Sequence, residues 1–347
     1  MSVQILTGDC RETLRTLPRE SVHCVVTSPP YFGLRDYGVA GQIGLEASPD
    51  AFVDELVAVF RDVRRVLRTD GTLWLNLGDS YAAVNRGENA RPRVETLTGI
   101  QVANPHADIR TRSEVIKSQK TAGIKQKDLL GVPWLVAFAL RADDWWLRQD
   151  IIWSKPNPMP ESVTDRCTKA HEYIFLLSKS ERYYYNQDAI AEPVADATIS
   201  RLAQDIESQE GSYRVPGKTN GTMKAVRKRA DRFGGNKHNG DTTKHSDGSI
   251  YEGRETRNRR SVWTVNTEGY SEAHFATFPP ALIEPCILAG CPKGGTVLDP
   301  FGGAGTTGLV ADRLGRNAIL IELNPEYAAM AERRIKNDAP LFAVVNS

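Results

Sequence analysis

The sequence lacks the features that would indicate a metalloprotein, a secreted protein or a membrane protein. Only five of its 347 residues are cysteines, none of them forms a Cys-x-x-Cys pair, and no His/Cys cluster has the spacing of a zinc site. No apolar run reaches the ~18 residues that a membrane span requires. The start has no basic segment followed by an apolar one, which a signal peptide would need. We therefore expect a cytoplasmic protein with reduced thiols, without a metal and without a membrane partner.

An excess of charge of one sign is also missing. The chain has 44 Lys and Arg against 43 Asp and Glu, so any affinity for nucleic acid must come from a local basic patch. Residues 211–260 supply one, with thirteen Lys and Arg against five Asp and Glu. A second polar stretch, at about 84–127, holds nine Lys and Arg and has no clear period. Both stretches are predicted to be irregular, because they have few large apolar residues.

What the sequence does contain is an alternation of strand and helix patterns. Apolar residues at helical spacing follow Ala51, while β-rich runs such as Thr296-Val-Leu-Asp-Pro-Phe301 read as buried strands. Alternation of this kind predicts an α/β fold of the doubly wound type, with a mostly parallel sheet covered on both faces. The predicted strands span 22–27, 72–77, 145–153, 171–177, 296–301 and 317–323, and the predicted helices span 51–67, 132–140, 278–289, 306–314 and 326–336.

A glycine-rich turn lies between the predicted strand at 296–301 and the helix after it. Gly303, Gly305 and Gly308 fit the pattern Gly-x-Gly-x-x-Gly, which lets a backbone approach a ligand closely at a helix start. Glu322 ends the next strand about twenty residues on, where a carboxylate can accept both hydroxyls of an adenosine ribose. The motif alone leaves NAD and S-adenosylmethionine open. Asp299, expected at the strand tip, favours a ligand with an ammonium group over one with a phosphate.

A second motif, Thr27-Ser-Pro-Pro-Tyr31, follows the predicted strand at 22–27. Two prolines stiffen the backbone and remove two N–H donors, so the nearby carbonyls can only accept hydrogen bonds. A serine before the prolines and an aromatic residue after them would form a slot with acceptors at one edge and a stacking face. Such a slot suits an amino group on a planar heterocycle.

Ser-Pro-Pro-Tyr early in the chain and Asp-Pro-Phe-x-Gly-x-Gly late in it resemble the β permutation class of bacterial amino-methyltransferases. These enzymes belong to restriction–modification systems and have phage relatives. The resemblance covers most of the chain and implies a Rossmann-like methyltransferase sheet with a circularly permuted motif order. It also implies S-adenosyl-L-methionine as cofactor and a flipped base in double-stranded DNA as substrate. A cognate restriction endonuclease and a homodimer are left open as partners.

The resemblance assigns roles to individual residues. Ser28, Pro29, Pro30 and Tyr31 would form the catalytic segment, in which Ser28 and the Pro29 carbonyl hold the target amino group and Tyr31 stacks on the base. The cofactor would be bound by Asp9, Phe278, Asp299, Phe301, Gly303, Gly305, Thr306, Thr307 and Glu322. The target pocket would include Lys155, Asp165, Arg166, His171 and Glu172, although a surface ion-pair set and a core histidine would explain the last four equally simply. Residues that would contact DNA are Arg227, Lys228, Arg229, Arg232, Arg257 and Arg260.

The same resemblance divides the chain into five segments. Residues 1–83 would be the catalytic half and 84–128 a polar insertion, while 129–189 would complete the catalytic half. Residues 190–262 would be the target recognition region and 263–347 the half that binds S-adenosylmethionine. Cys286 and the tryptophans Trp145, Trp146 and Trp153 are expected to be packing residues, since transfer to an amine needs no nucleophilic cysteine.

The target atom is left open between two amines. Family members with serine before Pro-Pro-Tyr tend to methylate cytosine N4, and those with aspartate tend to methylate adenine N6, so Ser28 favours cytosine. Two other classes of protein remain alternatives. An NAD-dependent oxidoreductase would need a site for hydride transfer that the sequence does not show, and a DNA-binding protein without catalysis would not need Ser28 and Asp299.

Overall fold

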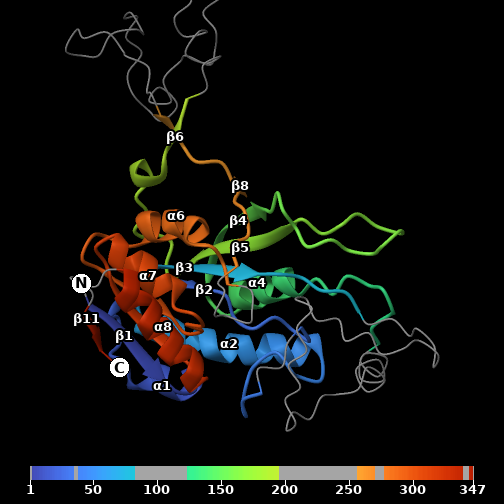
Figure 1. Cartoon of the computed structure of the whole chain (residues 1–347), viewed down its shortest axis with the longest axis horizontal. Coiled ribbons are helices and arrows are strands. Elements are labelled where there is room, and N and C mark those ends of the chain that lie inside the picture. The colour runs from blue at the N-terminus through green and yellow to red at the C-terminus, as the bar shows by residue number, and fades with distance from the viewer. Residues whose placement is uncertain are drawn as a thin grey trace, which may run out of the picture. The chain divides into compact units, whose positions relative to one another are not determined.

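The computed structural model describes residues 2–34, 38–82, 123–194, 256–269, 277–338 and 344–346. Strands and helices alternate over most of this length (Figure 1). The strands are β1 (Ser2–Thr7), β2 (Val22–Thr27), β3 (Leu67–Leu77), β4 (Trp146–Ser154), β5 (His171–Ser178), β6 (Glu192–Pro193), β7 (Thr256–Arg257), β8 (Val262–Thr264), β9 (Thr296–Asp299), β10 (Asn317–Glu322) and β11 (Val344–Asn346). The helices are α1 (Cys10–Thr16), α2 (Pro49–Val66), α4 (Val132–Ala142), the 3-10 turn η1 (Asp188–Ile190), α6 (Pro280–Gly290), α7 (Thr306–Arg313) and α8 (Pro325–Asp338).

Nine of these strands form one sheet, in the order β11-β1-β10-β9-β2-β3-β5-β4-β8. Its neighbours are parallel except for β3 with β5 and β4 with β5. This mostly parallel sheet confirms the predicted doubly wound α/β class. From β9 the chain winds through α7 to β10 on one side, and from β2 it winds through α2 to β3 on the other. The order of the strands therefore reverses between β9 and β2.

Helices cover both faces of the sheet. Successive strand residues point to opposite faces, and in β3 the buried side chains on both faces pack against helices. Leu73, Leu75 and Leu77 of β3 pack in the core cluster that contains the apolar residues of α2 and α4. Thr72 and Trp74 point the other way, where Gly290 of α6 approaches them closely. Helix α7 contacts α6 and α8, while α2 contacts α1 and α4. Figure 1 shows α6 and α2 on opposite sides of β2 and β3.

Local signals explain where α2 begins and why it packs. Ser48 accepts a hydrogen bond from the Ala51 N–H at 3.2 Å, and Pro49 occupies the first helical position. Phe52, Leu56 and Phe60 are fully buried at helical spacing. Each such side chain contributes about 1.5–3 kcal/mol when it leaves water.

The structure corrects several predicted details. The strand expected to continue to Phe301 ends at Asp299, because the glycine turn starts there, and the helix expected from Phe278 begins at Pro280. Trp145 and Trp153 are buried as expected, but Trp146 is 45% exposed. Trp145 and Trp146 are adjacent, so they cannot both face the core. Cys286 is buried in α6 as a packing residue.

The chain divides into two compact units, one of residues 1–189 with 260–347 and one of Ile190–Arg259. In the second unit the described residues include a short antiparallel pair, β6 with β7. Strand β8 begins at Val262, so the last residue of the segment predicted to recognise DNA belongs to the main sheet. The insertion predicted at 84–128 lies outside the described residues up to position 122. Among the described residues, no helix has the length and apolar character that crossing a bilayer demands.

Candidate active site

The two sequence motifs meet where the strand order reverses. Strands β2 and β9 pair in parallel, with Cys24 opposite Val297 and Val25 opposite Leu298. Their carboxyl ends therefore point to the same edge, which is where ligands bind in open α/β sheets. Ser28 follows directly after β2, and the glycine turn follows directly after β9. The structure thus brings residues about 270 positions apart to one edge of the sheet.

Asp299 joins these two strand ends. Its Oδ1 accepts hydrogen bonds from the Thr27 hydroxyl at 2.6 Å and from the Phe301 N–H at 3.1 Å, and its Oδ2 accepts from the Thr307 hydroxyl at 2.7 Å. The side chain is fully buried, and this burial raises the pKa of Asp299 to about 7 against the lowering effect of the hydrogen bonds. Asp299 is the last residue of β9, at the strand tip as expected, but its carboxylate is buried. Through Thr27 and Thr307 it connects the end of β2 to the start of α7.

The glycine turn has the backbone conformations that its glycines allow. Gly305 has φ of +78° and precedes α7, and a Cβ there would lie 2.7 Å from the Cβ of Ala331. Gly303 has φ of +50°, and a Cβ there would meet only the Phe301 carbonyl oxygen, at 3.9 Å. No side chain caps the start of α7. The turn therefore offers an open approach at Gly303 and backbone N–H groups for a ligand.

Glu322 lies against this turn, as the sequence predicted for an acidic residue at the end of the next strand. Its Oε2 accepts from the Gly303 N–H at 2.7 Å and its Oε1 from the Asn324 N–H at 2.9 Å. Burial raises the pKa of Glu322 above its ordinary value, although these backbone hydrogen bonds oppose the shift. Each carboxylate oxygen keeps a second lone pair, so Glu322 can still accept from a hydroxyl.

Asp9 lies in the segment beside Glu322, because Thr7 of β1 pairs with Glu322 of β10. Its carboxylate caps α1 and pairs with Arg11, whose hydrogen bond lowers the pKa of Asp9. Arg11 also reaches Glu55 and the carbonyl of Gly41. Asp9 is thus fixed near the turn, with its charge shared with a cation.

The remaining residues predicted to bind the cofactor differ in their surroundings. Phe278 and Phe301 are half-buried. Thr306 and Thr307 are buried, and their hydroxyls bond to the protein: Thr306 accepts from Arg334 at 2.9 Å, and Thr307 donates to Asp299. The hydroxyls of both threonines therefore already bond to the protein, and the backbone N–H groups at the start of α7 have no side-chain cap.

The segment Ser28–Tyr31, predicted to be catalytic, lies at the centre of a polar cluster to which four parts of the chain contribute. The Tyr31 hydroxyl donates to Glu172 Oε2 at 2.6 Å. The Asn76 amide group lies 2.7 Å from the Tyr31 hydroxyl, 3.0 Å from Glu172 Oε2 and 3.3 Å from Ser28 Oγ. Lys155 pairs with Glu172 Oε1 on the far side. Ser28 and Tyr31 remain half-buried while Pro29 is buried, so the serine hydroxyl stays at the edge of the cluster.

Charge in this cluster is balanced. Burial alone would raise the pKa of Glu172, but the charge of Lys155 and hydrogen bonds from Lys155, Tyr31 and Asn76 lower it below its ordinary value. Lys155 also lies over the Trp153 ring, with Nζ 4.2 Å from the ring centre. The Lys155–Glu172 pair is thus an ion pair with little exposure, 16% for one side chain and 14% for the other.

Sequence reasoning missed two residues of this cluster. Asn76 is a single polar residue within the apolar run of β3, and that exception was its only signal. Gly78 gives the Tyr31 ring its space, because a Cβ there would lie 2.5 Å from Tyr31 Cε2. Both follow from the neighbouring position of β3 beside β2.

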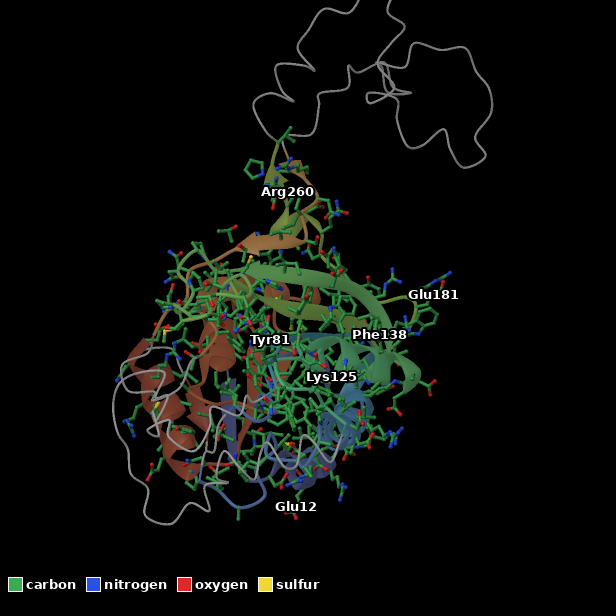
Figure 2. The ribbon with its side chains drawn as sticks, turned by 90° about the vertical axis from the view of Figure 1, so that its right-hand side faces the viewer. Glu12, Tyr81, Lys125, Phe138, Glu181 and Arg260 are labelled. Carbon is green, nitrogen blue, oxygen red and sulfur yellow. The ribbon has the colours of Figure 1, made fainter. Side chains whose placement is uncertain are left out.

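Of the five residues predicted for the target pocket, the structure brings Lys155 and Glu172 to Ser28. Asp165 is exposed and pairs with Lys127 at 2.6 Å. Arg166 pairs with Glu161 and lies 3.8 Å above the ring of Tyr81, which is labelled on the face shown in Figure 2. His171 packs edge-on against Tyr173. The surroundings of these three residues are therefore the ion pairs and ring packing expected from the alternative interpretation of the sequence.

The residues predicted to contact DNA are mostly outside the described part of the chain. This holds for Arg227, Lys228, Arg229 and Arg232. Arg257 lies in β7 and pairs with Glu192 of β6 at 3.4 Å. Arg260 precedes β8, and its carbonyl accepts from the indole N–H of Trp263. The described residues contain no group of three or more His, Cys, Asp or Glu side chains that could hold a metal ion.

Comparison with known proteins adds three kinds of similarity. A family model described as DNA methylase, for N6 and N4 methyltransferases, matches residues 22–333. The Type II methyltransferase M.SmaI of Serratia marcescens is 42% identical over 334 residues, which cover 96% of this chain and 91% of that protein. The Type II methyltransferase M.Cfr9I of Citrobacter freundii is 42% identical over 331 residues, covering 95% and 87%.

Two solved structures have the same fold. TTHA0409 of Thermus thermophilus, in complex with S-adenosyl-L-methionine, matches with a TM-score of 0.55 at 23% identity, covering 99% of this chain and 100% of that one. The cytosine-N4-specific PvuII DNA methyltransferase matches with a TM-score of 0.57 at 18% identity, covering 99% and 95%.

Proposed function

We propose that this chain, which belongs to the family of N4 and N6 DNA amino-methyltransferases, methylates N4 of a cytosine flipped out of duplex DNA. Family membership makes the protein a DNA methyltransferase and sets aside the NAD-dependent oxidoreductase and the DNA-binding protein without catalysis. The target atom and the role of each residue are the proposal. One observation carries it: Ser28-Pro-Pro-Tyr31 lies at the end of β2, directly beside the strand that leads into the glycine turn.

The chemistry needs an amine to be made nucleophilic, because the lone pair of an exocyclic amine is delocalised into the ring. Ser28 Oγ and the Pro29 carbonyl accept the two N–H hydrogens of that amine, which favours a pyramidal nitrogen. Pro29 and Pro30 have no N–H group that could compete for these acceptors. The Tyr31 ring supports the plane of the base. Catalysis by this segment is a matter of orientation and of fixed hydrogen-bond acceptors.

The cofactor side fits S-adenosyl-L-methionine. Gly303 leaves open space for a ligand, the start of α7 offers backbone N–H groups, and Glu322 can accept the ribose hydroxyls. Asp9 in the neighbouring segment would border the adenine. When bound, S-adenosyl-L-methionine supplies an electrophilic methyl group on a sulfonium, and the amine nitrogen is the group that receives it.

Duplex DNA is the substrate, and its target base must leave the stack to reach Ser28. The basic segment 190–262 is the candidate for recognising the sequence, and Arg257 and Arg260 are the described arginines among the residues predicted to contact DNA. An arginine that contacts only phosphate adds affinity for every duplex and adds to the salt dependence, whereas one that reads a guanine edge adds ~1–3 kcal/mol at its own site. Arg257→Ala and Arg260→Ala, measured against a library of duplexes, separate these roles.

The wider setting of the enzyme is part of the same proposal. We expect it in the cytoplasm, where DNA and S-adenosyl-L-methionine are found. A cognate endonuclease that cuts the unmethylated site would make it one half of a restriction–modification pair, and a homodimer would be its assembled form. Sedimentation of the purified protein with and without DNA tests the last of these.

Cytosine is favoured over adenine because a serine, not an aspartate, precedes Pro-Pro-Tyr. The test is nucleoside mass spectrometry of DNA from cells that express the chain or its Ser28→Ala variant. N4-methylcytosine in the first sample and not in the second is the expected result. N6-methyladenine would overturn the choice of base, and the absence of any methylated nucleoside from the wild-type sample would overturn the activity.

A further inference from the structure

The polar cluster behind Ser28 contains more charge than a stacking residue and a hydroxyl need. Tyr31 could support a base with its ring alone, yet its hydroxyl donates to Glu172 at 2.6 Å. Glu172 comes from β5, two strands away from β2 in the sheet. A residue that only filled space at this position would not need a carboxylate with 14% exposure.

Lys155 makes this carboxylate tolerable. It pairs with Glu172 Oε1 and keeps Oε2 for Tyr31 and Asn76. Lys155 in turn lies over the Trp153 ring. The charged and titratable groups that face Glu172 are therefore Lys155, the more distant Lys169 and the Tyr31 phenol. Because the pKa of Glu172 is lowered, its charge is constant through the neutral range, and it is poorly suited to take the proton that the amine releases.

Asn76 connects the carboxylate to the serine. Its amide nitrogen lies within 3.3 Å of all three oxygens, those of Ser28, Tyr31 and Glu172. Its amide oxygen is buried and has no hydrogen-bond partner in the part of the chain that the structure describes. An unsatisfied buried acceptor is costly, and such groups persist where a site needs them. The Glu172 carboxylate can only accept hydrogen bonds, so the amide nitrogen of Asn76, not the amide oxygen, must face it.

We propose that the Lys155–Glu172 pair is a positioning device, which fixes the Tyr31 hydroxyl directly and Ser28 Oγ through Asn76. Glu172 and Asn76 are positioning residues, not catalytic ones, because they act through Ser28 and Tyr31. The inference rests on the proposed function of Ser28 but not on which base is methylated. It assigns to Asn76 a role that its position in an apolar strand does not suggest.

The first test compares single-turnover methyl transfer in Tyr31→Phe and Glu172→Gln with wild type. Both variants should transfer the methyl group about 10- to 100-fold more slowly. Each lacks the charged hydrogen bond between Tyr31 and Glu172, so the reacting groups are oriented less well for transfer. Both should keep the wild-type dissociation constant for S-adenosyl-L-methionine. In Tyr31→Phe, fluorescence of 2-aminopurine at the target position should still rise on binding, because the ring that supports the flipped base remains.

Tyr183→Phe is the matched control. It also removes a phenol hydroxyl in contact with a charged side chain, Arg148 at 3.2 Å, but far from Ser28 along β4 and β5. Its rate should equal that of wild type. Wild-type rates in Tyr31→Phe and Glu172→Gln would overturn the inference. A wild-type enzyme that methylates adenine would overturn only the choice of cytosine, because the variants are compared on whichever base is methylated.

The second test measures the pH dependence of the single-turnover rate, which would not shift if a variant had only lost part of its structure. Asn76→Asp puts a second carboxylate about where the amide nitrogen lies, 3.0 Å from Glu172 Oε2. Two carboxylates this close cannot both be ionised easily, so the higher of the two apparent pKa values of the pair is strongly raised. The acid limb of the single-turnover rate should move to higher pH in Asn76→Asp and move back when Glu172→Gln is added. An acid limb that is the same in all three proteins would overturn the coupling.

Discussion

The two strand ends that meet at the candidate active site are built in different ways. At the end of β9 the side chains of Asp299, Thr306 and Thr307 bond to the protein, and the backbone of the glycine turn has open space at Gly303. At the end of β2 the surface is made of side chains, with Ser28 and Tyr31 held by residues of β3, β5 and the segment after β4. The end of β9 depends on the backbone conformation of the glycine turn and its close packing. The end of β2 depends on the charges and hydrogen bonds of side chains.

This difference predicts which property a mutation will change at the end of β9 and which at the end of β2. A substitution in the glycine turn alters the shape of the backbone, so stability and cofactor binding change together. Ser28→Ala, in contrast, removes one polar atom without a change in backbone conformation, so its effect should fall mainly on the rate of transfer. Removal of one partner of the Lys155–Glu172 pair should also lower stability, because the other charge is then left unpaired. The following predictions test that separation, in order of decreasing effect.

The largest effect is expected from Gly305→Ala. The residue has φ of +78°, and a Cβ there would lie 2.7 Å from the Ala331 Cβ, which has no flexible end to move away. The left-handed conformation costs roughly 1–2 kcal/mol and the overlap about 1–3 kcal/mol more. Gly294→Ala is the control, since φ is +76° and nothing lies within 4 Å. Urea unfolding should show a clearly larger loss in Gly305→Ala, and equal losses would refute the role of close approach.

Ser28→Ala should mainly affect chemistry. The variant removes an acceptor that is used when the amine occupies the slot, so single-turnover transfer should fall about 100-fold or more. Urea unfolding and calorimetric titration with S-adenosyl-L-methionine should give wild-type values. If the free energy of unfolding falls as much in Ser28→Ala as in Gly305→Ala, the proposed separation between effects on stability and effects on the rate is wrong.

Glu322→Gln tests the side chain that is proposed to accept the ribose hydroxyls of the cofactor. It keeps an acceptor for the Gly303 N–H but loses the charge that strengthens hydrogen bonds from a ribose. The dissociation constant for S-adenosyl-L-methionine should rise about tenfold, as expected for one charge-assisted hydrogen bond. Glu326→Gln, on the exposed first turn of α8, is the control. Unchanged binding in Glu322→Gln would move the ribose site elsewhere.

The smallest effect concerns pH and Asp299. Its pKa is raised from 3.8 to about 7, so the folded protein binds a proton there that the unfolded chain has released. The stability that Asp299 contributes should therefore fall as pH rises from about 4 to 7. Asp299→Asn should flatten this part of the curve of melting temperature against pH, measured without cofactor. Glu322 shifts in the same direction, so part of the slope should remain. Parallel curves for wild type and variant would contradict the raised pKa.

Much of the fold could be predicted because its signals are local. The Ser48-Pro49 start and the apolar spacing of α2 predict that helix without any knowledge of its partners. The glycine pattern likewise predicts the turn before α7 and the nearby place of Glu322. These features depend on residues within one strand–turn–helix unit, where periodicity and turn chemistry are informative.

The side-chain cluster could not be predicted in the same way. Asn76 contacts Ser28 and Glu172 across 48 and 96 residues of sequence, and periodicity contains no information about such partners. The burial of Asp299 was missed for a related reason: the sequence places it at the end of a strand but does not show that Thr27 closes over it. Resemblance to a family suggested Lys155 and Glu172 for the target pocket, and the structure adds that they contact each other.

The order of the sheet has a consequence for how the protein is made. Strand β1 pairs with β10 and β11, and β2 lies between β3 and β9. A ribosome releases β1 and β2 first, yet their partners β9 and β10 are synthesised some 270 to 320 residues later. Because pairings over long sequence separations form slowly, β1 must wait on the nascent chain with both edges unpaired. Until residues 296–322 have been synthesised, Thr27 lacks its hydrogen-bond partner Asp299, and Ser28 lacks the neighbouring glycine turn. We therefore expect that a partly synthesised chain cannot methylate DNA.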